Sequence, residues 1–327
     1  MPQARRHKLC WHALAVILGV ATTAAAQQPP LPGSPASAAT AETLRVDTRL
    51  VDLLFTVRDS KGRLIKNLNR EEFSVSDNGQ SQPITHFAEE SDRPLVLALV
   101  FDKSTSVEGH FNFQKRATTD FLHKVLRPGR DRALLIAVDK QPHLLVPFTD
   151  QPERISQALA PLESGGGTAL FDAAQLAIEK HLSQARQRRK ILILVTDGED
   201  TVSWATRGEV LALALASNVV VYSLGVRPDG PGRHRRARRN LVRLSDDTGG
   251  VALFPKDDPK ELAQLFAQVA DELRHQYSLG FVPPRSDVRV FHQVEIATKK
   301  KGYRVRARRG YYADLSQRTA HETNISR

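Results

Sequence analysis

Cysteine is almost absent from this chain of 327 residues, which has a single one, Cys10. Cys10 lies at the start of an N-terminal apolar segment that we expect to be removed, so the folded chain has no thiol with which to form a disulfide. Small secreted domains usually depend on disulfides for their stability. A folded portion of roughly 280 residues is large enough to be stabilised by its hydrophobic core alone.

Signatures of common enzyme classes are also missing. The sequence has no G-x-S-x-G, G-x-G-x-x-G or H-E-x-x-H motif, the patterns typical of serine hydrolases, dinucleotide-binding enzymes and zinc proteases. Asp102-Lys103-Ser104 resembles the start of the Asp-x-Asp motif of haloacid-dehalogenase-type phosphatases, but its second acid is missing, and the histidines are scattered. We therefore expect a protein that is not an enzyme, with a hydrolase whose site we do not recognise as an alternative.

The N-terminus has the pattern of an export signal. Arg5, Arg6 and Lys8 precede an apolar stretch over residues 13–26 that ends in three alanines and is followed by Gln27. The stretch is too short to span a bilayer comfortably, and its small residues form a cleavage pattern. We predict that residues 1–26 are a signal peptide and that the protein is exported, to the periplasm or the cell exterior, with a retained N-terminal anchor as the alternative. An exported location argues against ATP-dependent or NAD-dependent chemistry.

The remaining chain changes its pattern several times. Residues 27–42 are rich in proline, alanine and serine, which is typical of a flexible linker. Residues 43–90 and 277–313 alternate apolar and polar positions, as strands of an antiparallel sheet do. Residues 93–276 alternate continuous apolar runs with amphipathic helices, and residues 314–327 form a tail.

These patterns predict one fold class. Fully apolar strands that alternate with helices favour an α/β domain, a doubly wound and mostly parallel sheet with helices on both faces. Each β segment alone is too small to bury a good core. We therefore expect 43–90 and 277–313 to build one antiparallel β-sandwich from the two ends of the chain.

The net charge of +11 is concentrated in two basic stretches. Five arginines lie between Arg233 and Arg239, in what we expect to be a loop entering a helix, and seven Lys and Arg residues lie from Lys299 to Arg309. A solvated charge run and a surface for anionic envelope polymers or membranes are both open interpretations. Because no aromatic residues are interleaved, nucleic acid is a disfavoured partner. Arg304, Arg306 and Arg308 share one strand face, which we expect to face solvent.

Polar side chains collect where the apolar strands of residues 93–276 end. Asp102 follows one strand and Asp197 another; Ser104 and Ser106 lie in the loop after Asp102, and Thr168 follows three glycines just before a helix. Sites in open parallel sheets form at the carboxyl ends of the strands. Two acids and three hydroxyls are hard oxygen donors, which suit Mg²⁺, Ca²⁺ or Mn²⁺ better than Zn²⁺. Taken singly, each of these residues could instead be a helix cap. We expect Asp172, Glu199 and Asp200 to be capping groups or groups that support the ligands from behind, not ligands themselves.

Asp102-x-Ser104-x-Ser106, Thr168 and Asp197-Gly198 resemble, in residue type and order, the metal-ion-dependent adhesion site (MIDAS) of von Willebrand factor type A domains. The resemblance covers residues 93–276, and the wider arrangement resembles bacterial exported proteins of the VWFA-related type. It implies a Rossmann-like fold and one divalent cation, Mg²⁺ first, with Ca²⁺ or Mn²⁺ as alternatives. Ser104 and Ser106 would bind it directly, Thr168 directly or through water, and Asp102 and Asp197 through water.

The resemblance also implies a function. One open coordination position would take an Asp or Glu side chain of a partner protein, so that the chain is an exported binding protein. The alternative is an envelope-associated scaffolding protein whose metal site is structural and whose basic patches contact anionic surfaces.

Overall fold

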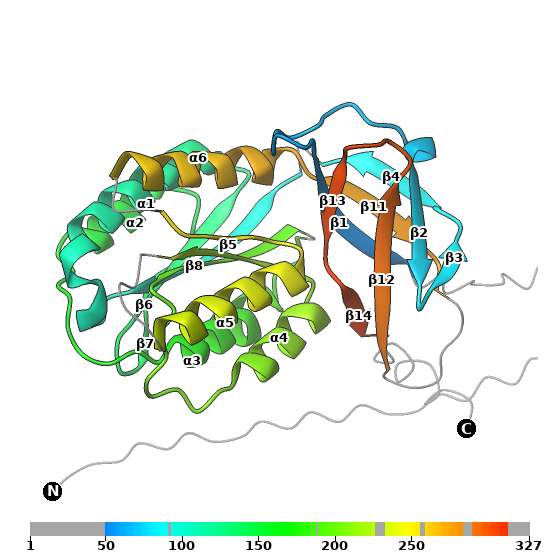
Figure 1. The fold of residues 1–327 in the computed structure, drawn as a ribbon. Coiled ribbons are helices and arrows are strands. Elements are labelled where there is room, and N and C mark those ends of the chain that lie inside the picture. Colours follow the sequence, from blue (N-terminus) through cyan, green and yellow to red (C-terminus); the bar gives the residue numbers. More distant parts are fainter. Residues whose placement is uncertain are drawn as a thin grey trace, which may run out of the picture. The chain divides into compact units, whose positions relative to one another are not determined.

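A six-stranded sheet forms the centre of the α/β portion, in the order β10-β9-β8-β5-β6-β7 (Figure 1). The computed structural model describes residues 50–90, 93–187, 189–225, 233–255, 259–283 and 290–312, so the predicted signal peptide, linker and tail lie outside the described residues. All neighbouring strands are parallel except β7, which is antiparallel to β6. The strands are β5 (Leu95–Asp102), β6 (Arg132–Val138), β7 (Pro142–Thr149), β8 (Arg189–Thr196), β9 (Val219–Gly225) and β10 (Ala252–Leu253).

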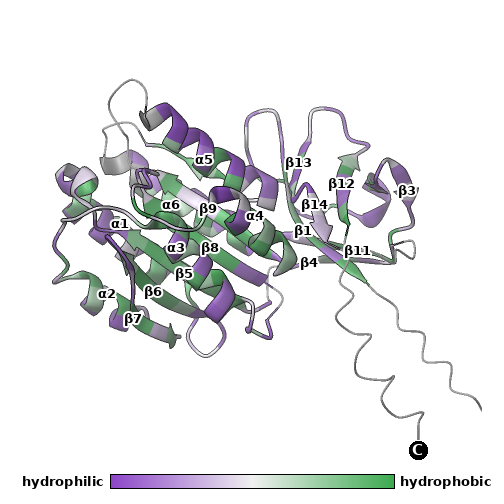
Figure 2. Cartoon of the chain, turned by 90° about the horizontal axis from the view of Figure 1, so that it is seen from below, coloured by the Kyte–Doolittle hydropathy of each residue, from purple (hydrophilic) through white to green (hydrophobic). Residues whose placement is uncertain are grey.

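Helices cover both faces of this sheet because its central strands are apolar on both sides. Along β5, Leu95, Leu97, Leu99 and Phe101 pack under α1 (Phe111–Val125), α2 (Pro152–Leu159) and α6 (Pro259–Arg274). The alternate residues of β5 pack under α3 (Leu170–Leu176), its continuation η3 (Ala177–Leu182), α4 (Arg207–Ala216) and α5 (Arg233–Thr248). Figure 2 shows the apolar central strands in green and the largely hydrophilic α5 in purple. The predicted doubly wound α/β class is confirmed.

Two four-stranded antiparallel sheets form the added β-sandwich. One has the order β13-β1-β11-β4 and the other β14-β12-β2-β3, so each combines strands from before and after the α/β portion. The strands are β1 (Val51–Arg58), β2 (Phe73–Asp77), β3 (Gln80–Gln82), β4 (His86–Glu89), β11 (Tyr277–Phe281), β12 (Phe291–Thr298), β13 (Arg304–Ala307) and β14 (Gly310–Tyr312), with a short helix η1 (Arg70–Glu72) before β2. Their shared core centres on Phe55, Phe73, Phe87 and Tyr277, whose ring centroids lie 5.1–6.3 Å apart. The sandwich predicted from the two ends of the chain is confirmed.

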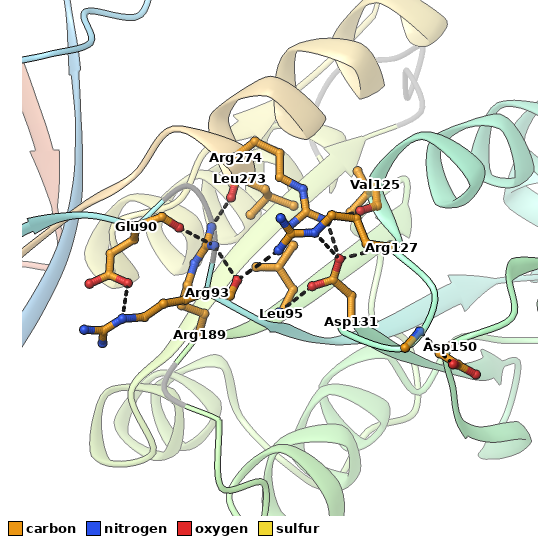
Figure 3. Close-up of polar contacts among 11 residues, drawn as sticks. Glu90, Arg93, Leu95, Val125, Arg127, Asp131, Asp150, Arg189, Leu273 and Arg274 are labelled. Carbon is orange, nitrogen blue, oxygen red and sulfur yellow. Dashed lines mark hydrogen bonds and ion pairs between the residues drawn. The ribbon is translucent and has the colours of Figure 1, made fainter.

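Buried arginine and glutamate side chains join the two portions. The guanidinium of Arg189, at the start of β8, is 1% exposed and donates to the main-chain carbonyls of Glu90, Arg93 and Leu273 (Figure 3). It also donates to the side-chain oxygen of Gln276. Arg189 therefore ties the segments that enter β5 and leave α6 to the base of the central sheet.

Glu272 of α6 makes a second connection between the two portions. Its carboxylate is fully buried and pairs with Arg58 of β1 and Arg306 of β13, and it accepts a hydrogen bond from the hydroxyl of Tyr222. Burying an ion pair costs the hydration of both charges, and this cost is offset only where polar partners surround the charges. Glu272 has such partners from the sheet of the α/β portion and from the sandwich.

Two sequence-based expectations are corrected. Arg304 is exposed, but Arg306 pairs with Glu272 and Arg308 is 8% exposed, donating to Asn218 and to the carbonyl of Asp52. This strand face therefore packs on the α/β portion, not against solvent. The basic stretch from Arg233 is the first half of α5, not a loop. The short helix α2 was not predicted.

None of the helices in the described ranges combines the length and apolar character needed to cross a bilayer.

Candidate metal centre

Three loops meet at the carboxyl edge of the sheet. Asp102 ends β5, and Ser104 lies in the loop that follows, which leads into η2 (Thr105–His110), where Ser106 lies. The amide of Gly165 donates to the carbonyl of Lys103 (2.6 Å) and that of Thr105 to the carbonyl of Gly166 (3.3 Å), which joins this loop to the glycine loop before Thr168. The third loop, after β8, begins at Asp197, and its Thr201 amide donates to the carbonyl of Thr168 (2.9 Å).

Asp102 is the most enclosed of the predicted ligands, with no exposed surface. Its Oδ1 accepts a hydrogen bond from the amide of Ser104 (2.8 Å) and its Oδ2 from the hydroxyl of Thr196 (2.6 Å). Burial raises the pKa of Asp102 to about 6; the hydrogen bonds from Thr196 and Ser104 oppose that rise, and the charge of Asp197 adds to it. The structure thus places two carboxylates within electrostatic reach of each other.

Asp197 is 3% exposed, and its Oδ1 accepts a hydrogen bond from the amide of Glu199 (2.9 Å). In the described part of the chain, neither Asp197 nor Asp102 forms an ion pair with Lys, Arg or His. The nearby cation Lys103 is paired with Asp139 instead, at 2.7 Å. Buried carboxylates without a cationic partner are costly, so this pair favours a bound cation.

The predicted hydroxyl ligands come from two of these loops, the one after β5 and the one before α3. Ser104 is 2% exposed, Ser106 is exposed, and their Oγ atoms are 2.9 Å apart. Thr168 is 2% exposed, and its amide donates to the hydroxyl of Thr201 (2.9 Å). Within the described ranges there is no cluster of three or more His, Cys, Asp or Glu residues that could hold a metal. For a metal at this edge, the serine and threonine oxygens would be further donors, and such a set suits Mg²⁺, Ca²⁺ or Mn²⁺.

Gly198 fixes the turn that aims Asp197. Its φ is +83°, in the left-handed region that side chains other than glycine rarely adopt. A Cβ at this position would lie 2.7 Å from Cδ1 of Leu241 and 3.3 Å from the carbonyl oxygen of Ala237, both in α5. The close approach of α5 to the turn thus requires glycine next to the acid.

The sequence did not single out Thr196, whereas Asp172 and Asp200 were expected to be capping groups or supports behind the ligands. Thr196, which hydrogen-bonds Asp102, directly precedes Asp197, and this position was its only signal. Asp172 accepts hydrogen bonds from the amides of Trp204 (3.1 Å) and Ala205 (2.8 Å), and Asp200 accepts one from the hydroxyl of Ser203 (2.5 Å). Asp172 and Asp200 therefore hold the loop before α4.

Residues 97–199, from β5 to the turn after β8, match the family model of the von Willebrand factor type A domain. This chain contains a von Willebrand factor type A domain. An uncharacterized protein of Borreliella burgdorferi (strain ATCC 35210 / DSM 4680 / CIP 102532 / B31) is 25% identical over 186 residues, which are 50% of this chain and 54% of that protein. The match therefore spans about half the length of that relative.

Several solved structures are similar to this chain at low sequence identity. Proximal thread matrix protein 1 from the mussel byssus, solved with a zinc-occupied MIDAS motif, is 15% identical, with a TM-score of 0.49 over 62% of this chain and 50% of that chain. The von Willebrand factor type A structure from Catenulispora acidiphila is 13% identical, with a TM-score of 0.46 over 80% and 73%. The vWF domain of the type V pili tip protein Mfa5 from Porphyromonas gingivalis is 13% identical, with a TM-score of 0.46 over 55% and 94%.

Proposed function

We propose that this chain is a binding protein whose type A domain holds a divalent cation, Mg²⁺ first, at the carboxyl edge of its sheet. Ser104, Ser106 and Thr168 would supply hydroxyl oxygens, with Asp102 and Asp197 behind them. The observation that carries the proposal is the buried pair of carboxylates with no cationic partner in the described chain, beside two serine oxygens 2.9 Å apart.

The donor set also suggests what the site captures. A cation that is bound mainly through neutral hydroxyls keeps more of its positive charge than one surrounded by carboxylates, and it supplies an open coordination position. An Asp or Glu side chain of a partner protein would provide the missing charge and oxygen. The chain's own contribution is to fix the hydroxyls through backbone bonds between the three loops and to enclose both acids.

We propose binding and not catalysis because the two serines lack the surroundings of a nucleophile. In the described residues, the hydroxyls of Ser104 and Ser106 bond to each other and no histidine contacts them. An activated serine needs an adjacent base. Export to the periplasm or cell exterior rests on the leader pattern of residues 1–26 and completes the proposal.

Pull-down from envelope extract tests this function. Immobilised protein should retain a partner in Mg²⁺ and release it in EDTA. The Thr168→Ala variant should retain less of that partner, while the matched Thr119→Ala variant, which changes a hydroxyl on α1 away from the site, should retain as much as wild type. A partner that stays bound in EDTA and to Thr168→Ala would contradict recognition through the metal.

A second candidate function rests on α5. Arg235, Arg236 and Arg239 are exposed on this helix and have no ion-pair partner among the described residues. They could attract an anionic envelope surface, with the metal serving only to stabilise the fold. Partner retention that is insensitive to EDTA and is lost at high salt would favour this scaffolding function.

A further inference from the structure

The loop between Asp200 and Thr206, which we name the rim loop, exposes apolar side chains beside the metal centre. Trp204 is 95% exposed, more than any other large hydrophobic residue in the described chain, and Val202 is 47% exposed. The indole therefore buries almost nothing within the fold. An exposed tryptophan of this kind has no role in stability that the structure shows.

The exposure of Trp204 does not come from a loosely held backbone. The amides of Trp204 and Ala205 donate to the carboxylate of Asp172, and the hydroxyl of Ser203 accepts from the amides of Phe171 and Asp172 (both 3.1 Å). The rim loop ends at the N-cap of α4, where Thr206 and Glu209 form a capping box. The loop is thus already ordered, so binding through it would require little further ordering.

The rim loop is also bonded directly to a predicted metal ligand. The amides of Thr201 and Val202 donate to the carbonyl of Thr168, at 2.9 and 3.2 Å. A Cβ added to Gly167 would lie 3.1 Å from the hydroxyl of Thr201 and 3.7 Å from Cγ1 of Val202. Because two residues span at most about 7 Å, Trp204 lies within reach of a peptide that is bound at the Thr168 hydroxyl.

On the basis of the proposed function, we infer that Trp204, with Val202, forms an apolar contact surface that selects the partner's sequence. The partner segment carries an Asp or Glu for the metal centre and, within a few residues of it, an apolar side chain that packs on the indole. Tryptophan is enriched among the residues that dominate binding energies at interfaces, and a docked indole buries a large apolar area.

The charges around the rim loop favour a protein partner over a membrane. Asp172 and Asp200 lie beneath it, and Asp102 and Asp197 lie at the adjoining edge. Four carboxylates would repel anionic lipid, and two apolar side chains form too small a surface to insert alone. The same carboxylates would repel an acidic peptide in the absence of the cation, so contact with Trp204 should depend on the metal.

Fluorescence provides a direct assay because the chain has only two tryptophans, Trp11 and Trp204. In a full-length Trp11→Phe background, Trp204 is the only tryptophan reporter. The probes are capped nonapeptides with one central Asp in a Gly-Ser background and one Leu at each of the other positions in turn. Matched peptides replace the Leu by Ser or the Asp by Asn, and anionic phosphatidylglycerol vesicles serve as the membrane probe.

We expect some Leu peptides to change the Trp204 emission in Mg²⁺ but not in EDTA, and to bind more tightly than their Ser counterparts. By calorimetry, Trp204→Ala should lose that advantage, about tenfold in affinity, while the Ser peptides bind both proteins equally. The control Val290→Ala, which removes another exposed apolar side chain (48% exposed), should behave as the parent protein does.

The outcomes separate this inference from the proposed function. Suppose that Asp peptides bind in a metal-dependent way but with equal affinity to the parent protein and to Trp204→Ala. That result would overturn the role of Trp204 and leave the proposed function intact. If no Asp peptide binds better than its Asn counterpart, the proposed function falls and the inference with it. A blue shift of Trp204 with vesicles, but with no peptide, would overturn the inference in favour of a membrane contact.

Discussion

Replacing Arg189 by methionine should destabilise the protein strongly, although the residue lies far from the candidate metal centre. Methionine keeps the length of the apolar stem but removes every donor. The guanidinium donates to the carbonyls of Glu90, Arg93 and Leu273 and to the side chain of Gln276. These acceptors would become unpaired where the chain enters β5 and leaves α6.

The expected magnitude follows from the number of acceptors and from the cost of the charge. Each buried polar group left without a partner costs about 1–3 kcal/mol. Methionine also removes a buried charge, and burial is already the main cause that lowers the pKa of Arg189 to about 10, so part of the loss is offset. We expect the free energy of unfolding to fall by about 3 kcal/mol.

Urea denaturation followed by circular dichroism measures this loss. Arg132→Met is the matched control because Arg132 is exposed at the start of β6 and its side chain forms no hydrogen bond or ion pair in the described chain. This control should change the free energy of unfolding by less than about 0.5 kcal/mol. If Arg189→Met loses no more than this control does, Arg189 does not hold the two portions together.

Three further variants test other parts of the structure. Glu272→Ala should lower the free energy of unfolding by about 3 kcal/mol, as measured in urea, because it leaves two arginines without their shared buried carboxylate; a loss near zero would contradict that pairing. Burial raises the pKa of Asp131, but hydrogen bonds, first that from Arg274, outweigh it and leave the pKa below its ordinary value. Its contribution to stability is therefore complete above that ordinary value and is lost as pH falls through the lower folded pKa. Asp131→Asn should therefore flatten the acid limb of the stability profile below about pH 4. Gly198→Ala should weaken Mg²⁺ binding severalfold by calorimetry, because its Cβ would collide with Leu241; unchanged affinity would show that the turn adapts.

Apolar runs made the central sheet predictable from the sequence. β5 and β8 are buried on both faces, so their uninterrupted aliphatic residues indicate strands in a parallel sheet, and the acids at their ends mark the carboxyl edge. The position of Asp102 and Asp197 on neighbouring strands follows from strand order, which periodicity alone does not determine. The structure shows that β5 and β8 are neighbours.

Long-range contacts explain what the sequence did not reveal. Alternation shows that Arg306 and Arg308 share a strand face, but it does not show that the face packs on α6 and on Asn218. The arginines that begin α5 are good helix formers, yet the Pro and Gly residues before them favoured a loop. The rim loop was missed because Trp204 belongs to no periodic pattern, and only its exposure beside Thr168 draws attention to it.

Calorimetric titration of Mg²⁺ into the full-length protein tests the central claim most directly. Wild type should bind one equivalent, and a Ser104→Ala/Ser106→Ala double variant, which lacks both serine oxygens, should bind at least about tenfold more weakly while unfolding at the same urea concentration. The control Ser156→Ala changes a serine on α2, away from the site, and should bind as wild type does. Equal Mg²⁺ affinity in wild type and the double variant, or no binding by wild type, would contradict the metal centre.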